Sequence, residues 1–94
     1  MGEKALLRAC REMRDANARD DWDDAEIVGS PAEYWLGDRR IAARTVELGL
    51  MMLLFHSEGI GTDYERHTLN ERGREYAETG AIPGFDLRKE QPHE

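Results

Sequence analysis

The most apolar stretch of the chain, residues 48–55 (LGLMMLLF), places the first constraint on its fold. A run this short cannot cross a bilayer, which needs roughly 20 apolar residues in a helix. We therefore expect it inside a folded core or beneath a partner. It also extends a helical pattern from upstream, because Ile41, Thr45, Leu48 and Met52 fall on one stripe at the helical repeat.

Asp38 is a good N-cap for this helix, which the pattern predicts from Arg39 to about Met52, with a short strand after it. The state of residues 50–55, helix or strand, stays open, because apolar residues there surround the whole circumference. Three arginines occupy the outer half of the helix: Arg39, Arg40 and Arg44. Instead of being buried in the core, three apolar residues could be exposed and form a dimer surface: Leu50, Met51 and Leu54.

Length and charge limit the classes of protein that fit. The 94 residues make one domain, and the net charge of −7 disfavours binding to nucleic acids and acidic membranes. The single Cys10 rules out an internal disulfide and predicts a reducing cytosol, so we expect a cytoplasmic protein. Charged residues interrupt the N-terminal segment, which therefore does not resemble a signal peptide.

The acidic residues gather around one tryptophan, Trp22, in residues 15–26. One interpretation is a solvated connector whose Trp22 folds back onto the core. The other is an acidic partner surface with an aromatic anchor, suited to a basic protein. That surface comprises Asp20, Asp21, Trp22, Asp23, Asp24 and Glu26. The carboxylates lack the alternating spacing of a calcium loop.

Local signals place the other elements. Helical periodicity predicts a helix from Glu3 to about Ala18. Residues 30–33 form a capping box with Pro31 at the first helical position, which favours a short helix over residues 31–36. The alternative is two β-rich pieces around a Gly-Ser-Pro turn. Either arrangement is expected to pack Trp35 against the central helix, which is the one predicted from Arg39 to about Met52.

Towards the C-terminus, residues 53–56 and 64–69 form a predicted hairpin across a loop that contains two glycines. Asn70 then caps a helix over residues 71–79, and Gly80 closes it. Residues 81–94 carry few apolar side chains and are expected to form a partly docked or flexible tail.

Two segments resemble the winged helix-turn-helix domain of small bacterial and phage regulators. Residues 39–46 (RRIAARTV) resemble the start of a recognition helix, and residues 64–74 (YERHTLNERGR) resemble the strand-to-helix step after the wing. The resemblance implies a mainly α fold of the α+β class. Its parts would be a three-helix core, a small β-hairpin and a C-terminal helix within a single domain, residues 1–80.

The sequence carries only weak motifs for catalysis, metal binding or phosphate binding. Ser57 follows His56, but no third group is placed in the sequence to orient that histidine as a base. The histidines have no ligand spacing with Cys10, and no glycine-rich phosphate loop follows a strand. We expect no enzymatic activity, no cofactor and no metal.

Two binding hypotheses remain, besides a structural or assembly subunit. In the first, the acidic surface binds and inhibits a basic, nucleic-acid-handling host protein. Small acidic proteins of phages and mobile elements, including inhibitors of CRISPR defence, resemble this chain in size and charge. In the alternative, the chain is a transcriptional regulator that binds duplex DNA through the predicted helix that carries Arg39, Arg40 and Arg44. Arg66 and His67, in the predicted hairpin or wing, would then contact the DNA backbone. The negative charge favours the first hypothesis, for a monomer or a homodimer.

Overall fold

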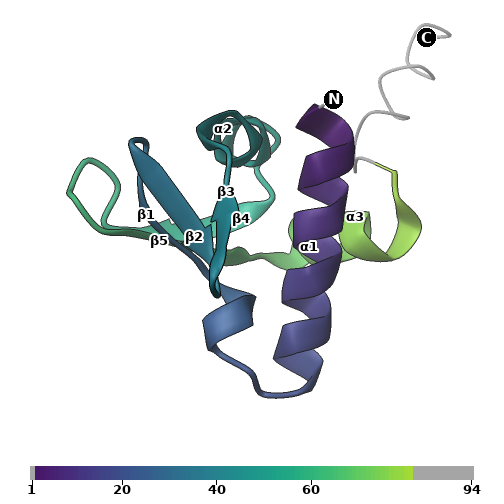
Figure 1. Ribbon diagram of the computed structural model, residues 1–94. Helices are drawn as coiled ribbons and strands as arrows, with labels where there is room; N and C mark the ends of the chain where they lie inside the picture. The colour runs from purple at the N-terminus through teal and green to yellow at the C-terminus, as the bar shows by residue number, and fades with distance from the viewer. Residues whose placement is uncertain (1, 82–94) are drawn as a thin grey trace, which may run out of the picture.

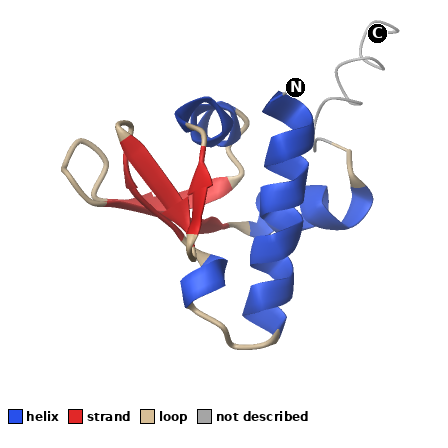
Figure 2. Ribbon diagram, in the orientation of Figure 1, coloured by secondary structure: helices blue, strands red, loops and turns tan. Residues whose placement is uncertain are grey.

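The computed structural model describes residues 2–81, which fold into an α+β domain with three α-helices and a five-stranded antiparallel sheet (Figures 1 and 2). All of the expected tail except Ala81 lies outside the described residues. The elements are α1 (Gly2–Ala18), the 3-10 helix η1 (Asp23–Ala25), β1 (Ile27–Ser30), β2 (Glu33–Leu36), β3 (Arg39–Ile41), α2 (Ala43–Met51), β4 (Phe55–Glu58), β5 (Glu65–Leu69) and α3 (Glu71–Thr79).

The strands are arranged in the order β3-β2-β1-β5-β4, so the central strand β1 lies between β2 and β5. Ile27 of β1 pairs with Leu36 on one side and with His67 on the other, and all three are buried. Because side chains alternate along a strand, the neighbouring row, in which Val28 pairs with Trp35 and with Arg66, lies on the opposite face. That opposite face carries the less buried side chains.

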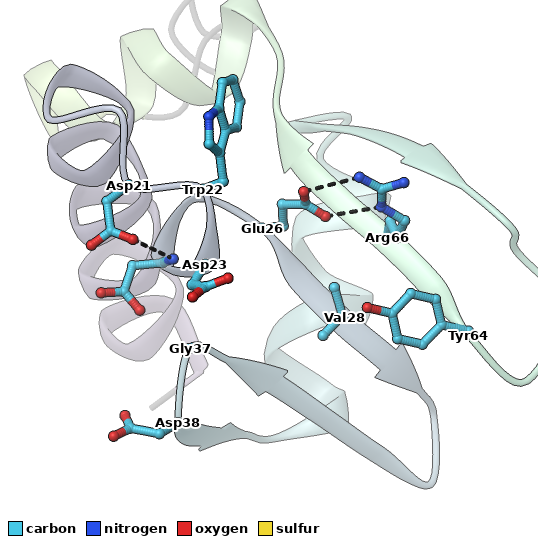
Figure 3. A pocket seen from close by; sticks show the side chains of 10 residues that line it. Asp21, Trp22, Asp23, Glu26, Val28, Gly37, Asp38, Tyr64 and Arg66 are labelled. Atoms are coloured by element: carbon cyan, nitrogen blue, oxygen red, sulfur yellow. Dashed lines mark hydrogen bonds and ion pairs between the residues drawn. The ribbon is translucent and has the colours of Figure 1, made fainter.

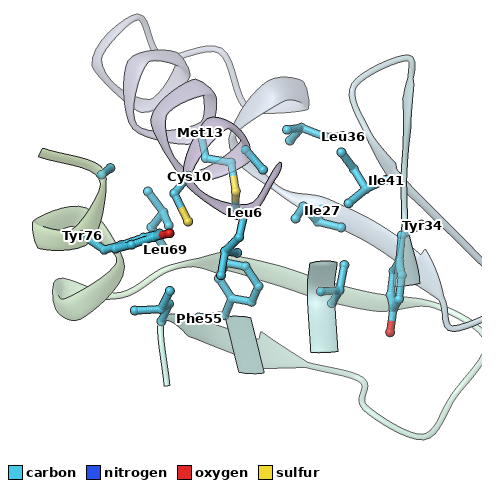
Figure 4. Packing of buried hydrophobic residues seen from close by; sticks show 14 residues of the cluster. Leu6, Cys10, Met13, Ile27, Tyr34, Leu36, Ile41, Phe55, Leu69 and Tyr76 are labelled. Atoms are coloured by element: carbon cyan, nitrogen blue, oxygen red, sulfur yellow. The ribbon is translucent and has the colours of Figure 1, made fainter. Parts of the chain in front are cut away.

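The core lies between the inner face of the sheet and the helices, with α1 against both α2 and α3 (Figures 1 and 4). Leu6, Cys10 and Met13 recur along α1 at helical spacing and are fully buried. Burial raises the pKa of the Cys10 thiol to about 12. From α3, Tyr76 reaches the same cluster and donates a hydrogen bond to the carbonyl of Glu3 at 3.2 Å.

Three predictions are confirmed. The first helix ends at Ala18 as expected. The hairpin is present as β4 and β5, with Phe55 paired to Leu69. The Asn70 side chain accepts a hydrogen bond from the Gly73 N–H at 2.8 Å, which caps α3 at the expected residue.

The expected short helix over residues 31–36 is wrong. The Ser30 hydroxyl accepts the N–H of Ala32 at 3.3 Å, so it closes the turn between β1 and β2 and does not cap a helix. The alternative of two β-rich pieces is confirmed, and the sheet is more extensive than the small hairpin that was expected.

The predicted start of the central helix is also wrong. Residues 39–41 form β3, in which Ile41 pairs with Tyr34, and α2 begins only at Ala43. The helix ends at Met51, so residues 50–55 divide into helix, turn and strand. In that turn the N–H of Leu54 donates to the carbonyl of Gly49 at 3.0 Å, and Leu53 takes the left-handed conformation with φ of 60°.

Candidate functional site

A groove of about 680 Å³ lies between η1 and the outer face of the sheet (Figure 3). Its walls come from the acidic segment after α1, from β1, from the turn between β2 and β3, and from the chain around the start of β5. The lining residues are Asp21, Trp22, Asp23, Asp24, Glu26, Val28, Gly37, Asp38, Tyr64 and Arg66. Five of the six residues expected to form the acidic partner surface are therefore brought together, and Asp20 is not among the lining.

Carboxylates crowd one wall of the groove. Burial and the neighbouring Asp21 carboxylate raise the pKa of Asp24. The Asp24 carboxylate occupies the space that a Cβ on residue 37 would need, and Gly37 itself has φ of 64°. Glycine at this turn therefore permits both the backbone conformation and the close approach of Asp24.

The single arginine of the groove is already engaged. Nε and an Nη of Arg66 each donate to a carboxylate oxygen of Glu26 at 3.0 Å (Figure 3), and this pairing raises the pKa of Arg66. Arg66 thus neutralises Glu26. Arg19, which does not line the groove, donates to the Asp21 carboxylate at 3.3 Å, while Asp23 and Asp38 keep the groove negative.

Two exposed aromatic side chains stand in this acidic surrounding. Trp22 is 66% exposed and Tyr64 is 59% exposed, and both line the groove with the half-buried Val28. The expectation that Trp22 folds back onto the core is wrong. Exposed aromatic rings inside a concave surface are typical of residues that anchor a binding partner.

The three arginines of the predicted helix do not form one cluster. Arg39, on β3, makes a bidentate ion pair with Glu12 of α1, with one N···O distance of 3.1 Å. Arg40, on the same strand, lies over the Trp35 ring at 5.8 Å from its centroid. Trp35 is half-buried on the outer face of the sheet and does not pack against α2 as expected. Only Arg44 belongs to α2, where it is exposed.

His67 was expected on the surface of the wing but is fully buried. Its Nδ1 lies 2.7 Å from the Ser57 hydroxyl, and its Nε2 lies 2.9 Å from a Glu65 carboxylate oxygen, which also accepts from the Tyr34 hydroxyl at 2.7 Å. Sequence reasoning missed this network. Strand alternation provided the signal, because Glu65 and His67 share the face of the buried Leu69.

The expected dimer surface is corrected in part. Leu54 is fully buried in the core, and Leu50 is partly buried against it. Met51 is 78% exposed, and Leu53, which was not singled out, is 64% exposed.

Within residues 2–81, no group of three or more His, Cys, Asp or Glu side chains is placed to hold a metal ion. Over the same residues, no helix has the length and apolar character to cross a membrane. Comparison of the chain with protein-family models, with curated proteins and with solved structures found no match.

Proposed function

We propose that this chain is a non-enzymatic protein-binding module whose acidic groove binds a basic segment of a nucleic-acid-handling protein and so inhibits it. The observation that carries the proposal is the combination of carboxylates with the exposed rings of Trp22 and Tyr64 in one groove. Carboxylates attract the lysines and arginines that otherwise contact phosphates, and the rings provide apolar anchors.

The positions of the basic residues support a protein partner over duplex DNA. Arg39 and Arg66 are each paired with a carboxylate of their own chain. His67 is buried and cannot reach a DNA backbone without unfolding β5. A DNA-binding surface gains most of its affinity from unpaired cations that contact phosphates.

The winged-helix relationship stays a prediction within this proposal. The β4–β5 hairpin followed directly by α3 supports it. The three strands β1 to β3, which precede α2 and extend the sheet, are not implied by that resemblance.

The proposal is tested with a short peptide of alternating arginine and leucine, using Trp22 fluorescence as the signal. Trp35→Phe removes the only other tryptophan, so the emission then reports Trp22 alone. We expect the Trp22 emission to shift to shorter wavelength on binding, because the ring leaves water. Raising the salt concentration should weaken binding, since exposed charges attract one another less at high ionic strength.

Matched variants separate the groove from the overall charge. Asp23 and Asp38 are exposed, and their conversion to asparagine should weaken binding by about tenfold. Glu75 and Glu78 are also exposed but lie on α3, so their conversion to glutamine changes the net charge by the same amount and should leave affinity unchanged. Equal losses from both pairs would mean that only net charge attracts the peptide.

Inhibition and DNA binding need separate measurements. The wild-type chain should displace a labelled RNA oligonucleotide from an arginine-rich peptide, and the Asp23→Asn, Asp38→Asn variant should do so less well. If the chain instead binds duplex DNA with a steep salt dependence that Arg40→Ala and Arg44→Ala flatten, the regulator hypothesis replaces this proposal.

A further inference from the structure

The strand β4 forms one edge of the sheet. An edge strand presents backbone N–H and C=O groups on its outer side, and these can pair with a strand from another chain. Among residues 2–81, β4 pairs only with β5, so its other side is open.

Exposed apolar side chains flank this edge at both ends. The described chain has five large apolar residues that are exposed, and three of them adjoin β4 in the sequence: Met51 and Leu53 before it, and Ile60 after it. Trp22 and Tyr64 are the other two and belong to the acidic groove. Such a concentration around one open edge indicates a surface that another molecule covers.

Leu53 adds an independent observation. Its φ of 60° places it in the left-handed region, where glycine is the usual residue at the end of a helix. Its side chain is 64% exposed, so packing within the monomer does not offset the strain of this conformation. A strained position that keeps a large apolar side chain in water suggests that this side chain acts in a contact outside the monomer.

The outward side chains of β4 are self-complementary, because His56 pairs with a carboxylate when it is protonated, as its 3.8 Å distance to Glu58 within one chain illustrates. His56 and Glu58 are exposed on the outer face of the sheet, on either side of Ser57. An antiparallel pairing of two copies about a two-fold axis at Ser57 places His56 opposite the partner's Glu58, twice in the dimer. The same operation about Arg40 at the other edge, β3, would oppose two arginines.

We propose that two copies of this chain form a homodimer by antiparallel pairing of their β4 strands, which joins the two sheets into one. The pairing places the end of each β4, which leads to the exposed Ile60, near the start of the partner's β4, which follows the exposed Leu53. This surface differs from the acidic groove, so the dimer and the proposed function can fail independently.

Sedimentation velocity over a range of concentrations tests the proposal on the full chain. We expect a reversible dimer for the wild type. His56→Glu places two carboxylates opposite each other in both halves of the interface and should weaken the dimer by about tenfold. Combining it with Glu58→Lys restores opposite charges and should restore the dimer. Lys4→Gln on α1 changes the net charge as His56→Glu does, and should have no effect.

Leu53→Gly separates the stability of the monomer from the affinity of the dimer, because the proposal predicts that the two change in opposite directions. Glycine relieves the strained backbone, so the variant should melt at a higher temperature than the wild type at low protein concentration, while its dimer weakens. A wild-type chain that stays monomeric at all concentrations would overturn the proposal. So would a dimer that His56→Glu leaves intact.

Discussion

Replacing Gly49 with alanine should have two opposing effects on stability: a gain in helix propensity and a steric overlap in the core. Gly49 lies inside α2, and alanine would favour the helix by about 1 kcal/mol. However, a Cβ at this position would lie 2.5 Å from Cε2 and 2.6 Å from Cζ of the Phe55 ring, and 3.2 Å from a methyl group of Leu6. Carbon atoms prefer separations of about 3.5–4.0 Å, so the ring would have to move by roughly 1 Å.

That movement is restricted because Phe55 is only 8% exposed and Leu6 is fully buried. Overfilling a packed core costs about 1–3 kcal/mol, which exceeds the gain in helix propensity. We therefore expect Gly49→Ala to destabilise the fold by about 1 kcal/mol, which for a domain of this size lowers the melting temperature by roughly 5 °C. Thermal unfolding at one fixed protein concentration measures the change, because dimerisation makes melting depend on concentration.

A second substitution identifies the cause. Phe55→Leu removes the two ring atoms that collide with the new Cβ, so alanine at position 49 should be tolerated better in that background. The double-mutant cycle should give a coupling energy above about 1 kcal/mol. If Gly49→Ala raises the melting temperature, or if the coupling energy is near zero, the steric reasoning is refuted.

Three further predictions concern the core and its caps. Asn70→Ala removes both the bond to the Gly73 N–H and the one to the Leu53 carbonyl at 2.9 Å, and should lower the free energy of unfolding in urea by about 1–2 kcal/mol. Burial raises the pKa of the Glu65 carboxyl, but hydrogen bonds from Tyr34, His67 and a backbone N–H lower it below its usual value overall. The stability from Glu65 is thus present above the ordinary glutamate pKa and is lost as pH falls through the lowered one, so Glu65→Gln should flatten the acid limb of a stability–pH curve. Native Cys10, with its pKa of about 12, should resist a thiol reagent at neutral pH and react at the rate of unfolding, whereas equal reaction rates in native and urea-unfolded protein would contradict its burial.

The elements that the sequence predicts correctly are those specified by neighbouring residues. Leu6, Cys10 and Met13 follow the helical repeat, and α1 forms as that repeat predicts. Asn70 and Gly80 mark the two ends of α3, and both act at the terminus itself. Such signals depend on a few adjacent residues, so they remain valid whatever the rest of the chain does.

The strand β3 could not be predicted in this way. Its three residues follow Asp38, a good N-cap by local criteria, but they are extended because Arg39 and Ile41 pair with β2. The energy of that pairing, and of the ion pair between Arg39 and Glu12, comes from parts of the chain that local patterns do not connect. A start signal for a helix was therefore overridden by tertiary contacts.

Half of the residues that line the groove can be predicted because they are neighbours in the sequence, as are the residues that specify α1. Its acidic wall is a contiguous segment, so composition alone indicates it. The rest of the lining includes Val28, Gly37 and Tyr64 from three separate parts of the chain, which meet only once the strand order is known. Sequence patterns indicate the charge of the site but not its concave shape.

Ion pairing of arginines within the chain explains how a protein with 13 lysine and arginine residues can keep a negative groove. Arg66 is paired with Glu26, and Arg39 with Glu12, in ion pairs that are partly exposed. Exposed pairs of this kind contribute little to stability, typically 0–1 kcal/mol. Their larger effect is on the electrostatic field, because each pair cancels a positive charge on the sheet while Asp23 and Asp38 remain in the groove. The proposed preference for a basic partner thus depends on which carboxylates the fold leaves uncompensated, more than on the total charge.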